Sequence, residues 1–165
     1  MCIRDSLYAG LMIDADGAPK VIEFNVRFGD PETQPVMLRL QSDLVGLLEA
    51  AIDGTLDGVE AQWDPRPSLG VVMAASPYPE TPITGDVISG LDAVPAHAKV
   101  FHAGTALDAA GNVIATGGRV LCVCALGDSV SAAQRAAYAG VEAISWAHAF
   151  HRHDIGWRAI ARERG

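Results

Sequence analysis

The first third of the chain places short apolar runs between turn-forming residues, a pattern typical of strands in a hairpin. Residues 7–13 and 20–26 are rich in Leu, Ile, Val and Phe, which suit a pleated and half-buried surface. The connecting residues 14–19 contain two Asp, a Gly and a Pro, which favour a turn. We therefore predict two strands joined as a hairpin.

Two helices are predicted after this hairpin. The first covers residues 31–40 and begins at a proline, with Asp30 as its N-cap, because a helix start tolerates the missing N–H of proline. The second covers residues 43–52, with Ser42 as its cap and Gly54 at its end. Its apolar residues recur at helical spacing, namely Leu44, Leu47, Leu48 and Ile52.

A linker separates this part of the chain from the rest. Residues 55–67 contain the turn pair Asp57-Gly58 and two prolines, which break regular structure. We place a domain boundary inside this linker, so that residues 7–62 form one domain and residues 63–165 the next.

The second domain combines short strands with one long helix. Its predicted strands are residues 69–75, 99–107, 112–115 and 118–126, and the last is expected at the centre of a sheet because it is apolar nearly throughout. A turn at residues 108–111 joins the second and third strands. The Pro-rich residues 76–85 are expected to form a surface loop.

The long helix is predicted to begin after Ser129, which suits an N-cap, and to run to about Ile144. Its expected buried stripe is Ala133, Ala136, Ala137, Val141 and Ile144. Hairpins together with helices define an α+β fold for both domains.

Composition narrows the classes of function. The net charge is −8 without a Lys/Arg cluster, which argues against nucleic acid or an anionic membrane as a partner. No apolar run is long enough to span a bilayer, so we expect a cytoplasmic protein. Three cysteines make no disulfide framework, and Cys122 and Cys124 share one face of an apolar strand, where we expect them to be small buried residues.

Three polar residues alternate with the apolar residues along and just after the second predicted strand. Side chains alternate along a strand, so Glu23, Asn25 and Arg27 are expected to point the same way. A carboxylate beside an amide carbonyl suits a hard cation such as Mg²⁺, and an arginine suits phosphoryl oxygens. The alternative is a solvated strand face. Asp30 and Glu32 follow directly, and helix capping with the helix dipole accounts for both without a functional role.

Residues 23–34, Glu-Phe-Asn-Val-Arg-Phe-Gly-Asp-Pro-Glu-Thr-Gln, closely resemble the signature of the phosphoribosylamine–glycine ligase family, also called glycinamide ribonucleotide synthetases, within the ATP-grasp superfamily. Further blocks follow in family order, at residues 68–75, 99–105, 117–121 and 154–160. The resemblance therefore extends over nearly the whole chain from about Leu7. It implies the C-terminal part of an ATP-grasp domain with antiparallel strands and helices, followed by the small α+β C-terminal domain.

The resemblance also implies a reaction and its site. Members join glycine to 5-phosphoribosylamine with ATP as co-substrate, forming glycinamide ribonucleotide through glycyl phosphate in purine biosynthesis. Glu23 and Asn25 match the family's ligands for Mg²⁺ or Mn²⁺. Arg27 and Asp30 match catalytic positions, and Arg27 with Glu32 is expected to face the nucleotide. The full-length protein is expected to be a cytoplasmic monomer.

Length qualifies this interpretation, because 165 residues are far fewer than the family's ligases contain. We interpret residues 1–6 as a foreign leader and the rest as a C-terminal fragment that is inactive alone. Two alternatives stay open. One is a non-catalytic binding or interaction module. The other is a different ATP-grasp enzyme, such as one resembling a biotin carboxylase.

Other polar residues allow two interpretations each. His102 and Arg119 lie in family blocks, where they face substrate or phosphate, or else serve a strand and a hairpin. The spacing of His148, His151, His153 and Asp154 resembles a metal cluster that lacks a further fixed ligand. Arg158 is interpreted as a structural salt-bridge partner. The three tryptophans, Trp63, Trp146 and Trp157, are expected to be packing residues.

Overall fold

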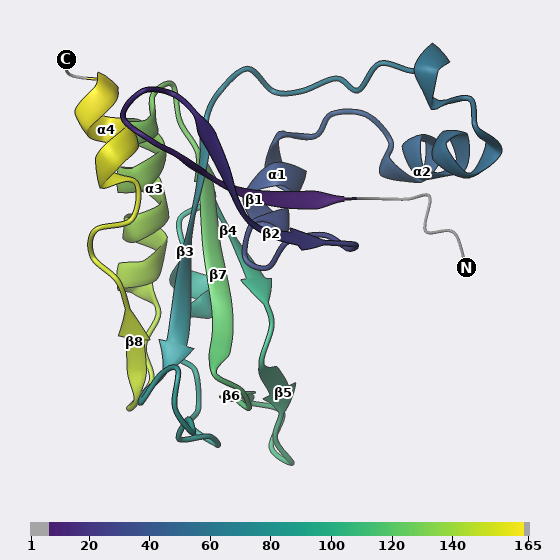
Figure 1. The fold of residues 1–165 in the computed structure, drawn as a ribbon. Coiled ribbons are helices and arrows are strands. Elements are labelled where there is room, and N and C mark those ends of the chain that lie inside the picture. Colours follow the sequence, from purple (N-terminus) through teal and green to yellow (C-terminus); the bar gives the residue numbers. More distant parts are fainter. Residues whose placement is uncertain (1–6, 164–165) are drawn as a thin grey trace. The chain divides into compact units, whose positions relative to one another are not determined.

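The computed structural model describes residues 7–163 (Figure 1). Of these, residues 7–33 and 40–64 form one compact unit, and residues 34–39 and 65–163 form the other. The interpretation of residues 1–6 as a leader lies outside the described residues. No helix in the described part of the chain is long and apolar enough to cross a membrane.

The first unit contains the predicted hairpin. Strand β1 (Tyr8–Ile13) pairs antiparallel with β2 (Pro19–Asn25), and a bulge lies between Gly10 and Leu11. The turn forms because Asp14 Oδ1 accepts hydrogen bonds from the backbone N–H groups of Asp16 (3.1 Å) and Ala18 (2.9 Å). Large apolar side chains of both strands are exposed, as Ile22 (64%) and Phe24 (60%) illustrate.

The first helix is shorter than predicted. Helix α1 (Thr33–Arg39) begins two residues after Pro31. A turn replaces the expected first residues, because both the N–H and the hydroxyl of Thr33 donate to the Gly29 carbonyl. The prediction that Asp30 caps a helix starting at Pro31 was therefore wrong.

The second helix, α2 (Leu44–Asp53), has a different cap from the predicted one. Asp43 is the N-cap, and its Oδ1 accepts from the Val45 N–H at 3.0 Å. The Ser42 hydroxyl instead accepts from the Gln62 N–H at 2.7 Å. The predicted end is confirmed, because Gly54 has the left-handed conformation (φ 73°) that favours glycine. A short 3-10 helix, Leu56–Gly58, follows.

The second unit is built on a four-stranded antiparallel sheet in the order β4-β7-β3-β8. Its strands are β3 (Ser68–Ala75), β4 (Ala98–His102), β7 (Arg119–Leu126) and β8 (Ala149–His151). The central position predicted for residues 118–126 is confirmed. Residues 76–85 form a loop, and a second 3-10 helix covers Leu91–Ala93.

One predicted strand divides between two sheets. Residues 99–107 separate into β4 and β5 (Thr105–Leu107), and β5 pairs with β6 (Val113–Ala115) as a separate hairpin. The chain bends at Gly104, where an added Cβ would lie 2.7 Å from the Arg119 carbonyl oxygen. This close approach leaves room for glycine alone and explains why the strand does not continue.

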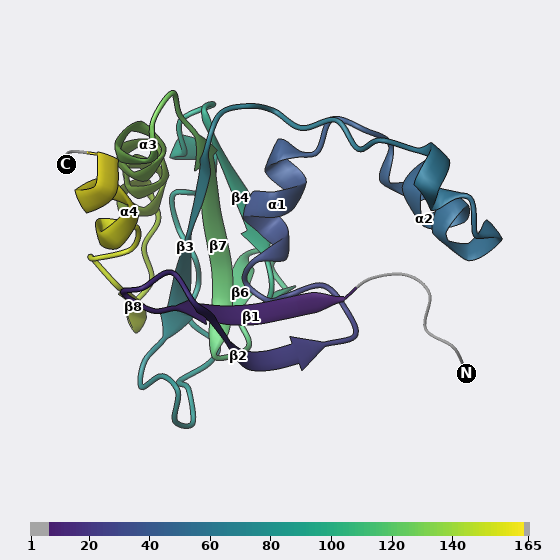
Figure 2. The ribbon, with the colours of Figure 1, turned by 45° about the horizontal axis from the view of Figure 1, so that its top comes forward.

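A helix covers one face of the four-stranded sheet (Figure 2). Helix α3 (Val130–Ala143) packs on one face, where Val71, Met73, Leu121 and Val123 meet Ala133, Ala137 and Val141 in the core. The other face carries Cys122 and Cys124, with sulfur atoms 3.6 Å apart. Both are buried, as predicted, and the hydrogen bond between them and burial raise the pKa of Cys124.

The cap of α3 is the predicted one, since Ser129 Oγ accepts from the Ala132 N–H at 3.1 Å. The N–H groups of Val130 and Ser131, the first two residues of α3, donate to the carboxylate of Glu163 at the end of α4 (Trp157–Glu163). We expect Ser129→Ala to lower the free energy of unfolding by about 1 kcal/mol. Urea denaturation followed by circular dichroism measures this, and Ser129→Asp, which keeps an acceptor, is the control. An equal loss in both variants would contradict the cap.

Candidate functional site

The cross-strand register of the first unit brings the predicted metal ligands onto one face of the hairpin. Asn25 lies opposite Tyr8, and Glu23 lies opposite Gly10. Side chains at opposite positions share a face of a sheet. Asn25 Nδ2 donates to Glu23 Oε1 at 3.1 Å, so the two predicted ligands are in direct contact.

Gly10 gives Glu23 the space it occupies. A Cβ at this position would lie 3.2 Å from Glu23 Cγ. Gly29 has a similar role in the turn after β2, because its Cβ would lie 2.4 Å from Glu32 Oε2 and 3.2 Å from Tyr8 Cδ2. Both glycines therefore permit carboxylates to approach the face of the hairpin.

Tyr8 joins these acidic residues into one cluster. Partial burial, the negative charge of Glu32, a hydrogen bond to Glu32 and the charge of Glu23 all raise the pKa of Tyr8. The sequence analysis did not identify Tyr8, because only the strand register shows that it faces Asn25. The site therefore contains Tyr8, Glu23, Asn25 and Glu32.

Arg27 and Asp30 lie beyond the strand. Because β2 ends at Asn25, alternation of side chains does not place Arg27 beside Glu23 and Asn25, and that argument was wrong. Arg27 Nη1 donates to the Phe28 carbonyl at 2.8 Å. Asp30 is exposed in the turn before α1. Both residues lie in the loop that joins β2 to α1.

The donor atoms fit a hard divalent cation. After the hydrogen bond between them, Glu23 Oε2 and Asn25 Oδ1 remain as oxygen ligands, the type that Mg²⁺ and Mn²⁺ prefer. Within residues 7–163 there is no group of three or more His, Cys, Asp or Glu that could hold a metal ion. Glu23 and Asn25 therefore supply part of a coordination shell, which suits Mg²⁺ because it usually retains several waters.

The contact between Tyr8 and Glu32 predicts a change in titration. Glu32→Gln removes the charge that raises the pKa of Tyr8, so this pKa should fall toward the ordinary value for tyrosine. Because a raised folded-state pKa stabilises below the unfolded value, stability should be lost as the pH rises through the tyrosine range. Residue-specific NMR titration measures the shift, with exposed Glu49→Gln as control. An unchanged pKa in Glu32→Gln would contradict the contact.

Several polar residues of the second unit have structural partners. His102 Nδ1 lies 3.1 Å from Thr105 Oγ1, and Arg119 Nη1 donates to the Tyr78 hydroxyl at 3.2 Å. His148 Nδ1 lies 2.7 Å from Asp86 Oδ2. These contacts support the structural interpretation of each residue and leave a role toward substrate as a prediction.

The histidines near the C-terminus contact one another. The rings of His151 and His153 have centroids 4.5 Å apart, and burial together with the charge of His153 lowers the pKa of His151. Among the tryptophans, Trp146 is buried at 8% exposure, as predicted. Trp63 (44%) and Trp157 (55%) are exposed, so their prediction as packing residues was wrong.

Comparison with known proteins identifies both parts of the chain. The family model described as "Phosphoribosylglycinamide synthetase, ATP-grasp (A) domain" matches residues 3–33, and the one described as "Phosphoribosylglycinamide synthetase, C domain" matches residues 68–158. The chain belongs to the phosphoribosylglycinamide synthetase, or phosphoribosylamine–glycine ligase, family. Neither model covers the linker, so the domain boundary between residues 62 and 63 stays a prediction.

Relatives named phosphoribosylamine–glycine ligase match nearly all of the chain. The relative from Xanthomonas campestris is 82% identical over 158 residues, which are 96% of this chain and 37% of the relative. Those from Xylella fastidiosa and Pseudomonas aeruginosa are 76% and 64% identical, over 95% and 96% of this chain and 36% and 37% of theirs. The chain thus spans little more than a third of these relatives.

A solved structure has the same fold. The crystal structure of phosphoribosylamine–glycine ligase from Thermotoga maritima is 34% identical, with a TM-score of 0.69 over 90% of this chain and 36% of that one. These matches confirm the predicted α+β fold and family. They also favour the glycine ligases over carboxylases within the ATP-grasp superfamily.

Proposed function

We propose that this chain takes part in the ATP-dependent ligation of glycine to 5-phosphoribosylamine, which gives glycinamide ribonucleotide, ADP and phosphate in purine biosynthesis. The observation that carries the proposal is the Glu23–Asn25 pair, which contact each other at 3.1 Å on one face of the hairpin. A relative from Xanthomonas campestris that carries this name is 82% identical to the chain. Because the chain spans 37% of that relative, the ligation is a proposal for the protein of full length.

The chemistry requires activation of the glycine carboxylate, which is a poor electrophile toward an amine. A carboxylate oxygen attacks the γ-phosphorus of ATP, the bond to ADP breaks, and glycyl phosphate forms. The nitrogen of phosphoribosylamine then attacks the carbonyl carbon. Phosphate leaves with one former carboxylate oxygen, and the amide of the product remains. Such phosphoryl transfer depends on positioning and on neutralising negative charge.

The residues of the hairpin suit these needs. Glu23 and Asn25 would hold Mg²⁺ or Mn²⁺, which when bound neutralises charge on the transferring phosphoryl group. Arg27 supplies a guanidinium that can donate to phosphoryl oxygens, and it lies with Asp30 at the exit of the strand. Glu32 faces the nucleotide, and its hydrogen bond with Tyr8 limits where its carboxylate can point.

The remaining expectations are part of the same proposal. The substrates are glycine, 5-phosphoribosylamine and ATP, and the full-length protein acts as a cytoplasmic monomer without nucleic acid or membrane partners. The net charge of −8 supports the absence of an anionic polymer as a partner.

A replacement chimera tests the proposal. In the chimera, the segment of the Xanthomonas campestris ligase that matches this chain is replaced by the residues of this chain. We expect ADP release that depends on both glycine and phosphoribosylamine, at a rate within a few-fold of the unmodified relative. A folded chimera that releases no ADP with both substrates present would contradict the proposal.

A further inference from the structure

Two histidines at the end of β8 remain from the metal-like spacing of His148, His151, His153 and Asp154. His148 is held elsewhere, because its Nδ1 and its backbone N–H lie 2.7 and 3.0 Å from Asp86 Oδ2. His151 and His153 instead contact each other, with ring centroids 4.5 Å apart and an angle of 66° between the ring planes. These two imidazoles are the part of the pattern that the structure brings together.

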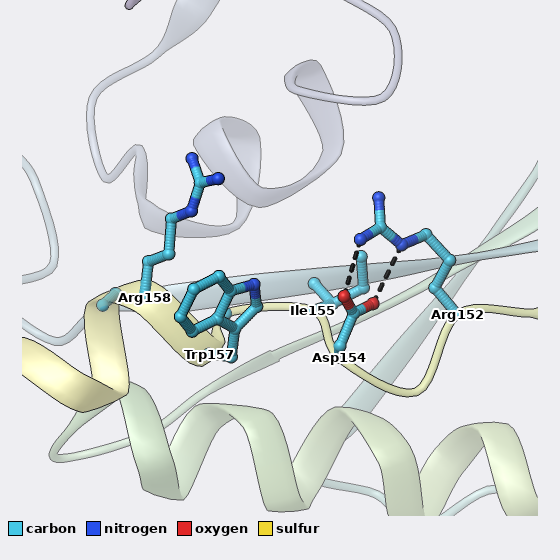
Figure 3. Close-up of a pocket in the computed structure, with 7 residues that line it drawn as sticks. Arg152, Asp154, Ile155, Trp157 and Arg158 are labelled. Atoms are coloured by element: carbon cyan, nitrogen blue, oxygen red, sulfur yellow. Dashed lines mark hydrogen bonds and ion pairs between the residues drawn. The ribbon is translucent and has the colours of Figure 1, made fainter. Parts of the chain in front are cut away.

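The charged residues that follow β8 make other contacts (Figure 3). Arg152 donates to Asp154 from Nε at 2.9 Å and from Nη2 at 2.7 Å, so the Asp154 carboxylate is already occupied. The guanidinium carbon of Arg158 lies 5.3 Å from the centroid of the Trp157 ring. No ion pair joins Arg158 to a carboxylate within residues 7–163, so its interpretation as a salt-bridge partner was wrong.

The backbone that carries the two histidines is fixed from two sides. His151 belongs to β8, which pairs with β3. The Tyr138 hydroxyl on α3 donates to the Arg152 carbonyl at 2.6 Å and accepts from the Ile155 N–H at 3.2 Å. The peptide between the histidines is therefore anchored to α3, and little backbone order has to be gained when a ligand binds.

The separation of the rings fits coordination of one metal ion by both. With a metal–nitrogen bond of about 2.0 to 2.1 Å, the centroid of a coordinated imidazole lies about 3.2 Å from the ion, so two imidazoles at right angles have centroids about 4.5 Å apart. The observed separation is 4.5 Å. Right angles between ligands are typical of the square-planar and tetragonal sites of Cu²⁺ and Ni²⁺.

The charges and the exposure around the two rings suit a cation. Glu142 of α3 lies near enough for its negative charge to act on the His151 ring. The positive charge of Arg152 is offset by its ion pair with Asp154. His153 is exposed and His151 is half-buried, so an ion can reach both rings from solvent.

We propose that His151 and His153 together bind a divalent transition-metal ion of the Cu²⁺ and Ni²⁺ class, with water in the remaining positions. Residues 7–163 contain no group of three or more His, Cys, Asp or Glu that could hold a metal ion, so the described chain supplies these two imidazoles as the ligands. The site differs from the hairpin pair in its donor atoms, because imidazole nitrogen suits these ions whereas Mg²⁺ prefers oxygen. The inference does not rest on the proposed ligation.

NMR titration of the ¹⁵N-labelled chain with Ni²⁺ tests the proposal, because a paramagnetic ion broadens the signals of nearby residues. We expect saturable broadening of the amide signals of residues 151–153, which Mg²⁺ at the same concentration leaves unchanged. His153→Gln should weaken Ni²⁺ binding at least about tenfold, since even the loss of a partner behind a ligand costs about 10 to 100-fold in metal affinity. His97→Gln, which removes an exposed histidine elsewhere in the same unit, should bind unchanged.

His151→Gln is the second variant, and it should weaken binding as His153→Gln does. Full affinity in either of these variants would mean that a single imidazole binds the ion, and would overturn the two-histidine site. Broadening centred on other residues, a response to Mg²⁺ at residues 151–153, or equal weakening by His97→Gln would also overturn it. The amide signals of the β3 and β7 core in metal-free samples show whether each variant is folded.

Discussion

Glu23→Gln is expected to lower the rate of ligation by the replacement chimera about 100-fold, because removing an electrostatic stabiliser of a reacting group typically costs this much. The substitution keeps the size of the side chain and its contact with Asn25 but removes the charge that a divalent cation needs. At a fixed Mg²⁺ concentration, the loss should appear in the chimera's kcat, which is measured by ADP release at saturating ATP. Raising the Mg²⁺ concentration should restore part of the rate, because the variant has fewer charged ligands and therefore binds the cation more weakly.

Glu49→Gln is the matched control. Glu49 is an exposed residue of α2 in the same unit, so its substitution removes the same charge without touching the hairpin. The control should keep the full rate. A Glu23→Gln chimera that is as active as the control at every Mg²⁺ concentration would leave Glu23 on a solvated strand face, which is the alternative that the sequence allows.

Gly90→Ala is expected to destabilise the second unit by about 4 kcal/mol, from the strain of a left-handed backbone and from overpacking. Gly90 has φ 83°, and an added Cβ would lie 1.9 Å from the Ala143 carbonyl oxygen. To relieve this clash the backbone must move, which would open the paired hydrogen bonds between Ser89 and Ser145 (2.9 and 3.1 Å). Urea denaturation monitored by near-UV circular dichroism measures the loss.

Gly111→Ala separates the two causes. Gly111 has nearly the same conformation (φ 84°), but no atom lies within 4 Å of its Cβ position. This variant should therefore lose only the backbone term, about 1 to 2 kcal/mol. Equal losses in the two variants would mean that the contact between Gly90 and the end of α3 does not constrain the fold.

Much of the fold could be predicted because its signals are local. The hairpin follows from an acidic turn between two apolar runs, and the start of α3 follows from a serine before an apolar stripe. β7 is apolar at almost every position, so its central place could also be predicted. In each case the deciding residues are neighbours in the sequence.

Features that depend on distant contacts could not be predicted in the same way. Strand β8 has three residues and forms only because β3 offers a free edge. The division of residues 99–107 into two strands depends on the close approach of Gly104 to the Arg119 backbone. The cap of α2 is Asp43 and not Ser42, whose hydroxyl accepts a hydrogen bond from the distant Gln62 N–H. None of these contacts leaves a pattern in the local sequence.

In the candidate site, too, the local sequence predicts some residues, whereas others depend on distant contacts. The spacing of Glu23 and Asn25 along one strand was enough to place them on one face. Tyr8 could not be found, because its place opposite Asn25 depends on a register that a bulge after Gly10 shifts. Arg27 was grouped with the pair by extending the alternation of side chains two residues beyond Asn25, where β2 ends.

The most direct test of the account follows an oxygen atom through the ligation. Glycine labelled with ¹⁸O in its carboxylate is supplied to the chimera with ATP and phosphoribosylamine, and the phosphate released is analysed by mass spectrometry. Because phosphate leaves glycyl phosphate with one former carboxylate oxygen, we expect one ¹⁸O atom in each phosphate formed. Unlabelled phosphate released together with product would contradict the acyl phosphate route.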